Sequence, residues 1–188
     1  MSELAPLLAR CRQGDALAWE SLVRRYHGRI LGLARHYMRQ QEEAHDVTQE
    51  IFIRIYERLD SFDGGETFVP WMLRLARNCC IDRIRRNNVR TPDVAVPVED
   101  DPPIASDDLG AEEITHRNER EALLYRAMGK MNESSREIIL LKEIQGLKLE
   151  EISKMLSVPI GTVKSRSNRA RTELARRIRT LDPSYGVG

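Results

Sequence analysis

Aromatic residues, cysteines and long apolar runs are all scarce in this sequence of 188 residues. Aromatic side chains make up 5% of the chain, which disfavours a large β-fold and suits helices packed through Leu, Ile, Ala and Met. No run approaches the roughly 20 consecutive apolar residues that a membrane span requires. In the first 15 residues an acidic residue precedes the first basic residue, and there is no extended apolar stretch, so we expect no signal peptide.

The three cysteines and four histidines do not form a disulfide framework or a metal site. Cys79 and Cys80 are adjacent and cannot easily bridge each other, and an odd cysteine count is typical of a reduced, cytoplasmic protein. We interpret this pair as small core side chains rather than a redox switch. No histidine has a second ligand at metal-site spacing, so we expect neither a metal nor another cofactor.

Charge is balanced over the whole chain but unevenly distributed along it. The formal net charge is +1, yet residues 1–90 carry +3, residues 91–113 carry −8 and residues 114–188 carry +6. Two basic blocks joined by an acidic segment indicate a polyanionic partner.

Helical periodicity dominates the first basic block, and no β-hairpin pattern occurs in it. The spacing predicts one helix from Asp15, its N-cap, to about residue 37, and a second over residues 43–59. Pro70 stands in the first turn of a third helix, where proline is tolerated, and that helix continues to about residue 86. The buried face of the second helix is expected to hold Val47, Ile51, Ile55 and Leu59.

Proline and acidic residues replace the helical pattern from residue 87 to residue 110, which is typical of an extended linker. Helical pattern then resumes at about residues 111–130 and 136–145, with Gly146 as a helix stop. We therefore predict an all-α fold of two small helical domains, residues 1–90 and 114–188, joined by a flexible acidic linker at 91–113.

The most specific pattern covers residues 149–171 and predicts a helix-turn-helix. Its inner contacts are expected from the spacing of Ile152, Leu156, Val158 and Val163. Residues 157–159 form a joint so short that the two short helices it connects would cross at a steep angle. Arginine, lysine and asparagine match base edges and phosphates in a major groove. We expect Thr162 to cap the second helix, whose outer face offers Lys164, Ser165, Arg166, Asn168 and Arg169.

Three segments, in this order along the chain, resemble bacterial sigma factors of the extracytoplasmic-function type. Residues 46–53 (DVTQEIFI) resemble their core-polymerase-binding helix. Residues 71–78 (WMLRLARN), followed by 82–86 (DRIRR), resemble their −10 promoter helix, and residues 161–166 (GTVKSR), followed by 169–171 (RAR), resemble their promoter-reading helix. The resemblance extends over about residues 7–90 and 112–180.

Further residues agree with or depart from that family. Residues 12–15 (RQGD), with Trp19 and Leu22 after them, match its usual opening. Departures are Pro70 before Trp71, Lys148 in place of a Ser or Thr cap, Ser153 and Ser157 in place of a small apolar residue and a glycine, and Ser167 in place of an apolar residue.

The resemblance implies a cytoplasmic transcription initiation factor, not an enzyme, whose partners are core RNA polymerase, promoter DNA and an anti-sigma factor that closes on both domains. The residues implied to bind core polymerase are Asp46, Gln49, Glu50 and Ile53. Those implied to bind the −10 element are Trp71, Arg74, Arg77, Asn78, Arg83, Arg85 and Arg86. Those implied to bind the −35 element are Thr162, Lys164, Ser165, Arg166, Asn168 and Arg169.

Melting of the −10 element would expose a base, which needs a pocket with polar edges and apolar walls. We expect Asn78 to read it, because an amide offers both a donor and an acceptor. The loop from Phe62 to Phe68 would form part of that pocket.

Two other classes of protein remain open. A repressor or activator would use the same helix-turn-helix without polymerase, would have no use for the Asp46 face or the Asn78 pocket, and would bind its promoter alone. An enzyme of nucleic-acid processing needs a metal-binding carboxylate cluster, a nucleophile with its base, or a phosphate-binding loop, and the sequence contains no such motif.

Overall fold

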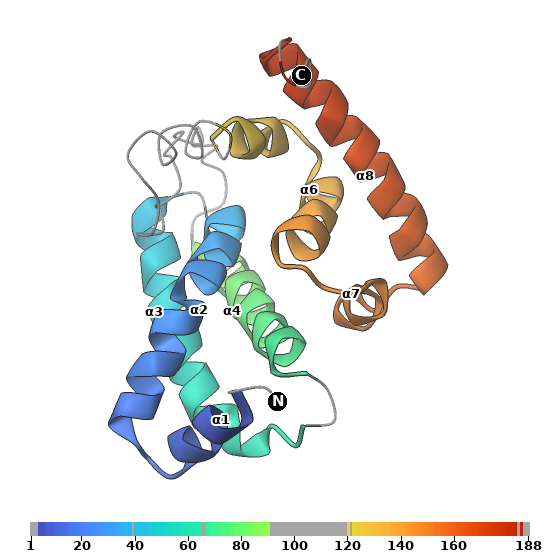
Figure 1. The fold of residues 1–188 in the computed structure, drawn as a ribbon. Helices are drawn as coiled ribbons and strands as arrows, with labels where there is room; N and C mark the ends of the chain where they lie inside the picture. The colour runs from blue at the N-terminus through green and yellow to red at the C-terminus, as the bar shows by residue number, and fades with distance from the viewer. Residues whose placement is uncertain are drawn as a thin grey trace. The chain divides into compact units, whose positions relative to one another are not determined.

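The computed structural model describes residues 4–38, 40–64, 67–90, 120, 122–183 and 185. For residues 88–90 it describes the backbone alone. Every regular element in these ranges is helical, as predicted (Figure 1). The chain divides into two compact units, Met1–Glu99 and Asp100–Gly188, so the division falls within the segment expected to be the linker. That segment, residues 91–113, lies outside the described residues. Within the described ranges, no helix is long and apolar enough to cross a membrane.

The described part of the first unit holds four α-helices and one short 3₁₀ turn (Figure 1, blue to green). They are α1 (Leu4–Arg12), α2 (Ala16–Tyr37), α3 (Gln41–Arg58), the 3₁₀ turn η1 (Leu59–Ser61) and α4 (Phe68–Arg90). Helices α2, α3 and α4 all pack against one another, and α1 packs against α2 and η1. The predicted helices α2, α3 and α4 are confirmed.

The turn between α1 and α2 is determined by local chemistry. Gly14 has φ +78°, a left-handed conformation that glycine adopts without steric cost. Asp15 is the N-cap of α2, as predicted, and its carboxylate accepts hydrogen bonds from the backbone N–H groups of Leu17 and Ala18. Arg10 also donates to Asp15 over 2.8 Å. The Ala18 N–H and the Arg10 guanidinium lower the pKa of Asp15 below its ordinary value.

Apolar stripes on α2, α3 and α4 form the core of the first unit, and the buried face predicted for the second helix is confirmed. In α3 and η1 the predicted residues Val47, Ile51, Ile55 and Leu59 are all fully buried. In α2 the buried members of the stripe are Leu22, Tyr26, Ile30, Leu33 and Ala34, whereas Trp19, Val23 and Tyr37 are half-buried. In α4 they are Leu73, Ala76 and Cys80, whereas Ile84 is half-buried. Helix α1, which the periodicity argument did not predict, adds Leu8 and Cys11 at i, i+3 spacing.

The vicinal cysteines are core side chains, as interpreted from the sequence. Cys79 and Cys80 are free thiols with 1% and 0% exposure. Burial raises the pKa of both thiols, that of Cys80 to about 12, so neither is a reactive thiolate at neutral pH.

Where the second unit is described, it consists of helical backbone at residues 122–129 and four further elements (Figure 1, yellow to red). These are α6 (Glu133–Ile139), a π-helical turn η2 (Leu140–Ile144), α7 (Leu149–Leu156) and α8 (Ile160–Leu181). Helix α8 packs against α6 and α7, and the buried side chains between the elements include Ile138, Ile139, Leu140, Leu141, Ile152 and Val163. Asn132 caps α6 by accepting from the Ser135 N–H over 2.9 Å.

Two left-handed residues turn the chain in this unit. Gly146 has φ +69° and follows Gln145, the C-cap of η2, which confirms the predicted helix stop. Ser157, the C-cap of α7, has φ +55°, and no other described non-glycine residue has a positive φ. The Ser153 hydroxyl donates to the Val158 carbonyl over 2.6 Å and fastens this joint. Lys148, the N-cap of α7, has no side-chain acceptor for the N–H groups of the first turn, whereas its own N–H donates to the Glu151 carboxylate over 2.7 Å.

Three details of the second unit differ from the sequence-based expectation. Thr162 does not cap α8: the helix begins at Ile160, after Pro159, and the Thr162 N–H already donates to the Pro159 carbonyl over 2.9 Å. The second helix of the joint is not short, because α8 continues for 22 residues. The helix predicted over 136–145 widens into the π-helical turn η2, which alters the register of the residues before Gly146.

Candidate functional site

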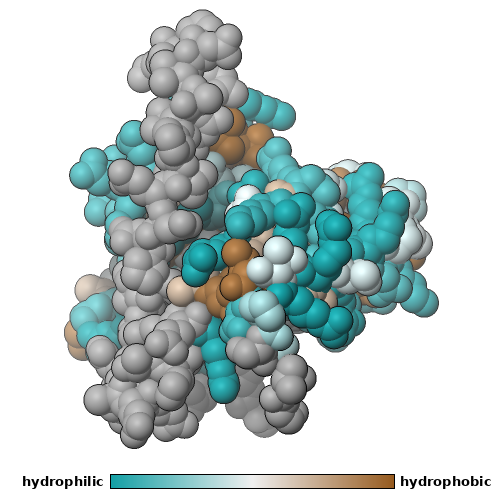
Figure 2. Space-filling model, turned by 90° about the horizontal axis from the view of Figure 1, so that it is seen from above, coloured by the Kyte–Doolittle hydropathy of each residue, from teal (hydrophilic) through white to brown (hydrophobic). Residues whose placement is uncertain are grey.

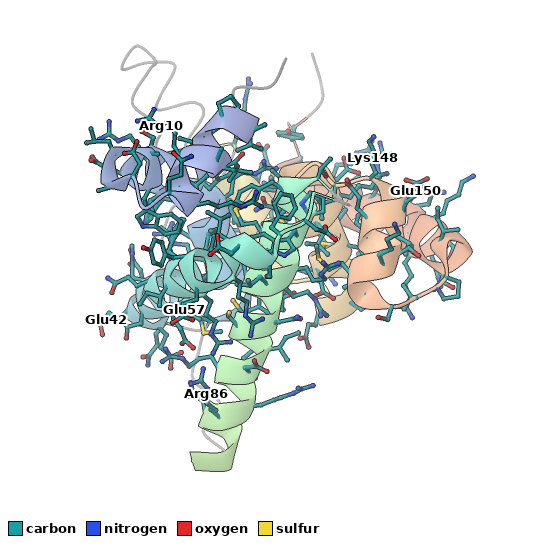
Figure 3. The ribbon with its side chains drawn as sticks, turned by 90° about the horizontal axis from the view of Figure 1, so that it is seen from below. Arg10, Glu42, Glu57, Arg86, Lys148 and Glu150 are labelled. Carbon is teal, nitrogen blue, oxygen red and sulfur yellow. The ribbon has the colours of Figure 1, made fainter. Side chains whose placement is uncertain are left out.

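A polar face with apolar members is exposed along α3. Asp46, Gln49 and Ile53 all point away from the buried stripe, and Ile53 is 59% exposed. Figure 3 shows Glu42 and Glu57, at the two ends of the helix, directed outward from α3. We call Asp46, Gln49, Ile53 and Tyr56 the α3 face.

Tyr56 belongs to this face although sequence reasoning did not select it. Its side chain is 56% exposed, and its ring meets that of Trp19 edge-on at a centroid distance of 5.1 Å. Trp19 also contacts Phe52 at 6.4 Å, so α2 supports the aromatic end of the face. The missed signal was spacing, because Tyr56 follows Ile53 by three residues and therefore lies beside it on the helix.

Glu50 is held inside the chain by three arginines instead of extending to solvent with its neighbours. Its carboxylate pairs with Arg54 at 2.6 Å, Arg83 at 3.0 Å and Arg86 at 3.1 Å. Only 24% of the Glu50 side chain is exposed. Nearby, the Asn87 amide donates to Glu43 over 3.0 Å, which adds a second contact between α3 and the C-terminal half of α4. We call Glu50, Arg54, Arg83 and Arg86 the Glu50 network.

Opposing effects of burial and of the neighbouring arginines determine the pKa of Glu50. Partial burial raises the pKa, but the hydrogen bonds from Arg83 and Arg86 and the positive charge of Arg54 lower it more, so the net pKa lies below the ordinary value. Glu50 is therefore an anion at neutral pH. The network joins a residue implied to bind polymerase to two residues implied to bind DNA, which the sequence did not indicate.

The remaining members of the implied −10 set lie along α4 with different exposures. Asn78 and Arg85 are exposed, and Arg86 is visible on the C-terminal half of α4 in Figure 3. Arg74 and Arg77 are half-buried and interact with other groups of the chain. The solvent-facing surface of α4 thus combines an amide, which can hydrogen-bond to bases, with basic side chains, which attract phosphates.

An aromatic cluster lies at the start of α4. Phe62, Phe68 and Trp71 contact one another with centroid distances of 5.2–5.6 Å, and Tyr26 of α2 contacts Phe68 at 5.5 Å. Phe62 and Phe68 are buried, whereas Trp71 is half-buried. The indole therefore offers part of its ring at the surface, seven residues before Asn78.

In the second unit, α8 separates an inner face from an outer basic face. Its buried residues are Val163, Ser167 and Ala170. The outward side chains are all exposed, as predicted: Lys164, Ser165, Arg166, Asn168 and Arg169. The Ser165 hydroxyl donates to the Thr162 carbonyl over 3.1 Å, so it is partly engaged by the helix itself.

Basic side chains continue along α8 beyond this face. Arg171 approaches Glu143 at 3.6 Å, and Arg177 pairs with Glu173 at 2.8 Å, whereas Arg176 and Arg179 are exposed. Figure 2 shows that hydrophilic residues cover most of the coloured surface on the face that it presents. Among the described residues, no group of three or more His, Cys, Asp or Glu side chains could hold a metal ion.

Comparisons with known proteins match both units. The chain matches the family description "Sigma-70 region 2" over residues 22–90 and "Sigma-70, region 4" over residues 121–174. It is 33% identical to the RNA polymerase sigma-H factor of Pseudomonas aeruginosa, over 93% of each chain. It is 32% identical to the ECF RNA polymerase sigma factor SigW of Bacillus subtilis, over 93% of this chain and 96% of that protein.

Two solved structures have a similar fold. CnrH, in complex with the cytosolic domain of CnrY, has a TM-score of 0.60 at 27% identity, covering 90% of this chain and 93% of that one. The sigma factor RpoE of Bartonella quintana, in complex with the anti-sigma factor NepR, has a TM-score of 0.67 at 20% identity, covering 85% and 96%. The likeness to RpoE concerns the fold alone.

Proposed function

The chain belongs to the extracytoplasmic-function sigma factors of the sigma-70 family, and on this premise we propose that it binds core RNA polymerase, directs it to promoters and assists melting of the −10 element. It acts in the cytoplasm by binding and has no catalytic role of its own. The observation that carries the proposal is that region 2 bears an exposed polar and apolar face on α3, while region 4 bears an exposed basic face on α8. Residues 1–90 form the polymerase and −10 domain, 91–113 the linker, and 114–188 the −35 domain.

The α3 face is the proposed contact with core polymerase. It offers an exposed carboxylate at Asp46, an amide at Gln49 and apolar side chains at Ile53 and Tyr56. An exposed apolar pair within a polar rim is typical of a protein-binding surface. Glu50 supports this surface from within the chain, because its carboxylate is already engaged by the Glu50 network.

The surface of α4 is the proposed contact with the −10 element. Arginines attract phosphates, and an exposed amide can hydrogen-bond a base that has left the stack. Asn78 takes the second role in this proposal, with Trp71 available for stacking. The phosphate contacts are assigned to Arg74, Arg77, Arg83, Arg85 and Arg86.

The outer face of α8 is the proposed reader of the −35 element. Arg166 and Arg169 are exposed, three residues apart and near the start of the helix, where a recognition helix contacts base edges. Lys164, Ser165 and Asn168 flank them, and Thr162 contributes from the first turn. Arg176 and Arg179 lie two or more turns later and would meet the backbone.

An anti-sigma factor is the proposed regulator. CnrH is solved with the cytosolic domain of CnrY, and RpoE with the anti-sigma factor NepR. We infer that a comparable partner binds this chain and covers its polymerase-binding and DNA-binding surfaces.

A pull-down with purified core polymerase tests the proposal most directly. The full chain should retain core polymerase, and the resulting holoenzyme should bind and melt a promoter selected from a randomised duplex library. Asp46→Lys should weaken retention by at least about tenfold, since a charge reversal at an interface costs several kcal/mol. Glu20→Lys, an equal charge change at an exposed α2 residue, is the matched control and should have little effect.

The alternative function has a distinct outcome in the same experiment. A repressor or activator would bind its selected duplex equally well with and without core polymerase, and would not be retained by the enzyme. That result would overturn the proposed function while leaving the −35 assignment of α8 in place.

A further inference from the structure

Arg12, the last residue of α1, reaches across to the chain that follows α3. Its Nε donates to the Leu59 carbonyl over 3.3 Å, and its Nη2 donates to the Phe62 carbonyl. These acceptors lie 47 and 50 residues away in the sequence. Arg12 begins the RQGD motif (residues 12–15) and lies before the residues that match region 2.

The chemistry of these acceptors explains why an arginine is present. Leu59 begins η1, the turn that ends α3, and its carbonyl accepts the Phe62 backbone N–H over 3.2 Å, so Arg12 gives this carbonyl a second donor. Carbonyl groups at the end of a helical segment carry partial negative charge, which favours a cationic donor. A guanidinium offers several donors in a fixed plane and can therefore satisfy two carbonyls at once. An ammonium group of lysine is a single point and cannot reproduce this paired geometry.

Arg12 is itself held in place by its surroundings. Leu8 and Cys11 bury one side of α1, with exposures of 6% and 3%. Two residues after Arg12, Gly14 reverses the chain, and Asp15 is fixed at the start of α2 as its N-cap. The guanidinium therefore extends from a rigid base toward the end of η1.

Phe62 connects this contact to the surface of α4. Its carbonyl accepts from Arg12, while its ring meets Trp71 at 5.2 Å and Phe68 at 5.6 Å. A change in the backbone position of Phe62 would therefore move a ring that packs directly on the half-buried indole. Asn78 lies two turns further along the same helix.

We propose that Arg12 is a positioning residue for promoter opening: it fixes Phe62 against Trp71, and so fixes the part of α4 that holds the melted −10 strand. This inference rests on the proposed function of α4. The inference assigns α1 and the RQGD motif a role in promoter opening. In this proposal they act through Phe62 and Trp71 and do not contact the DNA themselves.

Holoenzymes assembled from core polymerase and the full chain test the inference. The variants are Arg12→Ala, Arg12→Lys and, as the matched control on the same helix, Arg10→Ala, whose side chain pairs with Asp15. Three quantities are measured for each: retention by core polymerase, binding to the selected duplex promoter, and binding to a fork-junction DNA with a single-stranded −10 element.

Arg12→Ala should lower affinity for the fork-junction DNA and permanganate reactivity of the −10 region by about tenfold, while retention and duplex binding change less than about twofold. Arg12→Lys should restore part of the loss, because it keeps the charge but not the paired donors. Arg10→Ala should behave as wild type.

Specific results overturn the inference. Equal losses in all three measurements would make Arg12 a stabiliser of the fold alone. Complete restoration by Arg12→Lys would show that charge, and not paired geometry, is what matters. If Asn78→Ala impairs fork-junction binding while Arg12→Ala does not, only the inference fails; if neither the wild type nor any variant opens a promoter, the proposed function fails.

Discussion

Replacement of Glu50 tests whether this residue acts within the chain or at the polymerase. Its carboxylate accepts from Arg54 at 2.6 Å, Arg83 at 3.0 Å and Arg86 at 3.1 Å, so Glu50→Ala leaves three cations without their shared anion. Arg83 has only 27% of its side chain exposed, and its Nε is buried without a partner among the described residues. Losing the carboxylate therefore cannot be compensated fully by water.

The expected cost follows from the number and exposure of these bonds. A hydrogen bond to a charged group contributes about 1.5–3 kcal/mol when buried, and pairs at the surface contribute about 0–1 kcal/mol. Because Arg86 is 52% exposed while Arg54 and Arg83 are mostly covered, we expect Glu50→Ala to cost about 2 kcal/mol in total. For a unit of this size the melting temperature should fall by roughly 8–16 °C.

The pH dependence of the unfolding free energy provides a second, independent test of this prediction. The folded-state pKa of Glu50 is lowered from its ordinary 4.5, so its stabilisation is fully present above pH 4.5 and is lost as the pH falls through the lower folded value. The difference in unfolding free energy between wild type and Glu50→Gln should therefore be constant from pH 7 to about pH 5. It should shrink at more acidic pH.

Urea unfolding followed by tryptophan fluorescence is the appropriate assay. Both tryptophans, Trp19 and Trp71, lie in the first unit, so the signal reports on that unit in the full chain. Gln49→Ala is the control, because Gln49 is exposed on the same helix and should change stability by less than about 0.5 kcal/mol. A loss below about 0.5 kcal/mol for Glu50→Ala, or a difference that does not vary with pH, would refute the reasoning.

Three further predictions concern single residues. Ser157→Gly should raise the unfolding free energy of the second unit by about 1 kcal/mol, because Ser157 has φ +55°; calorimetry that finds no gain would contradict this. Asn78→Ala should impair permanganate-detected melting more than duplex binding, and unchanged melting would remove Asn78 from the mechanism. Arg166→Ala should relax preference at one or two −35 positions by about 1–3 kcal/mol, whereas Arg179→Ala should weaken all sequences alike. Equal weakening of every −35 variant by Arg166→Ala, in binding to a variant library at two salt concentrations, would make Arg166 a phosphate contact.

Local pattern determined most of the helices and their ends. The i, i+4 stripe of Val47, Ile51 and Ile55 is fully buried, and the stop at Gly146 has the left-handed φ that such a stop requires. These features depend on residues within a few positions of one another, which is the range over which helical periodicity and capping operate. The exposure of Arg166 and Arg169 on α8 follows from the same periodicity.

Two local features, the start of α8 and the presence of α1, were not predicted correctly from the sequence, and each has a physical reason. Thr162 has the side chain of an N-cap, but Pro159 supplies a fixed φ of −56° one residue before the helix, so α8 begins earlier. Helix α1 is only nine residues long and its stripe consists of few residues, so it becomes evident only when Leu8 and Cys11 are seen to pack.

The sequence by itself determined the all-helical class, the two basic blocks, and the outward position of Asp46, Gln49 and Ile53 on α3 and of the basic side chains on the outer face of α8. Only the tertiary structure decided how those side chains are paired. Glu50 and Arg83 are 33 residues apart, and Arg12 and Phe62 are 50 apart. Contacts over such sequence separations depend on how α1, α3 and α4 pack, and the helical periodicity of the sequence does not determine that packing. Charge on a helix face can therefore be predicted from the sequence, whereas the partner that a charge will have depends on the assembled core.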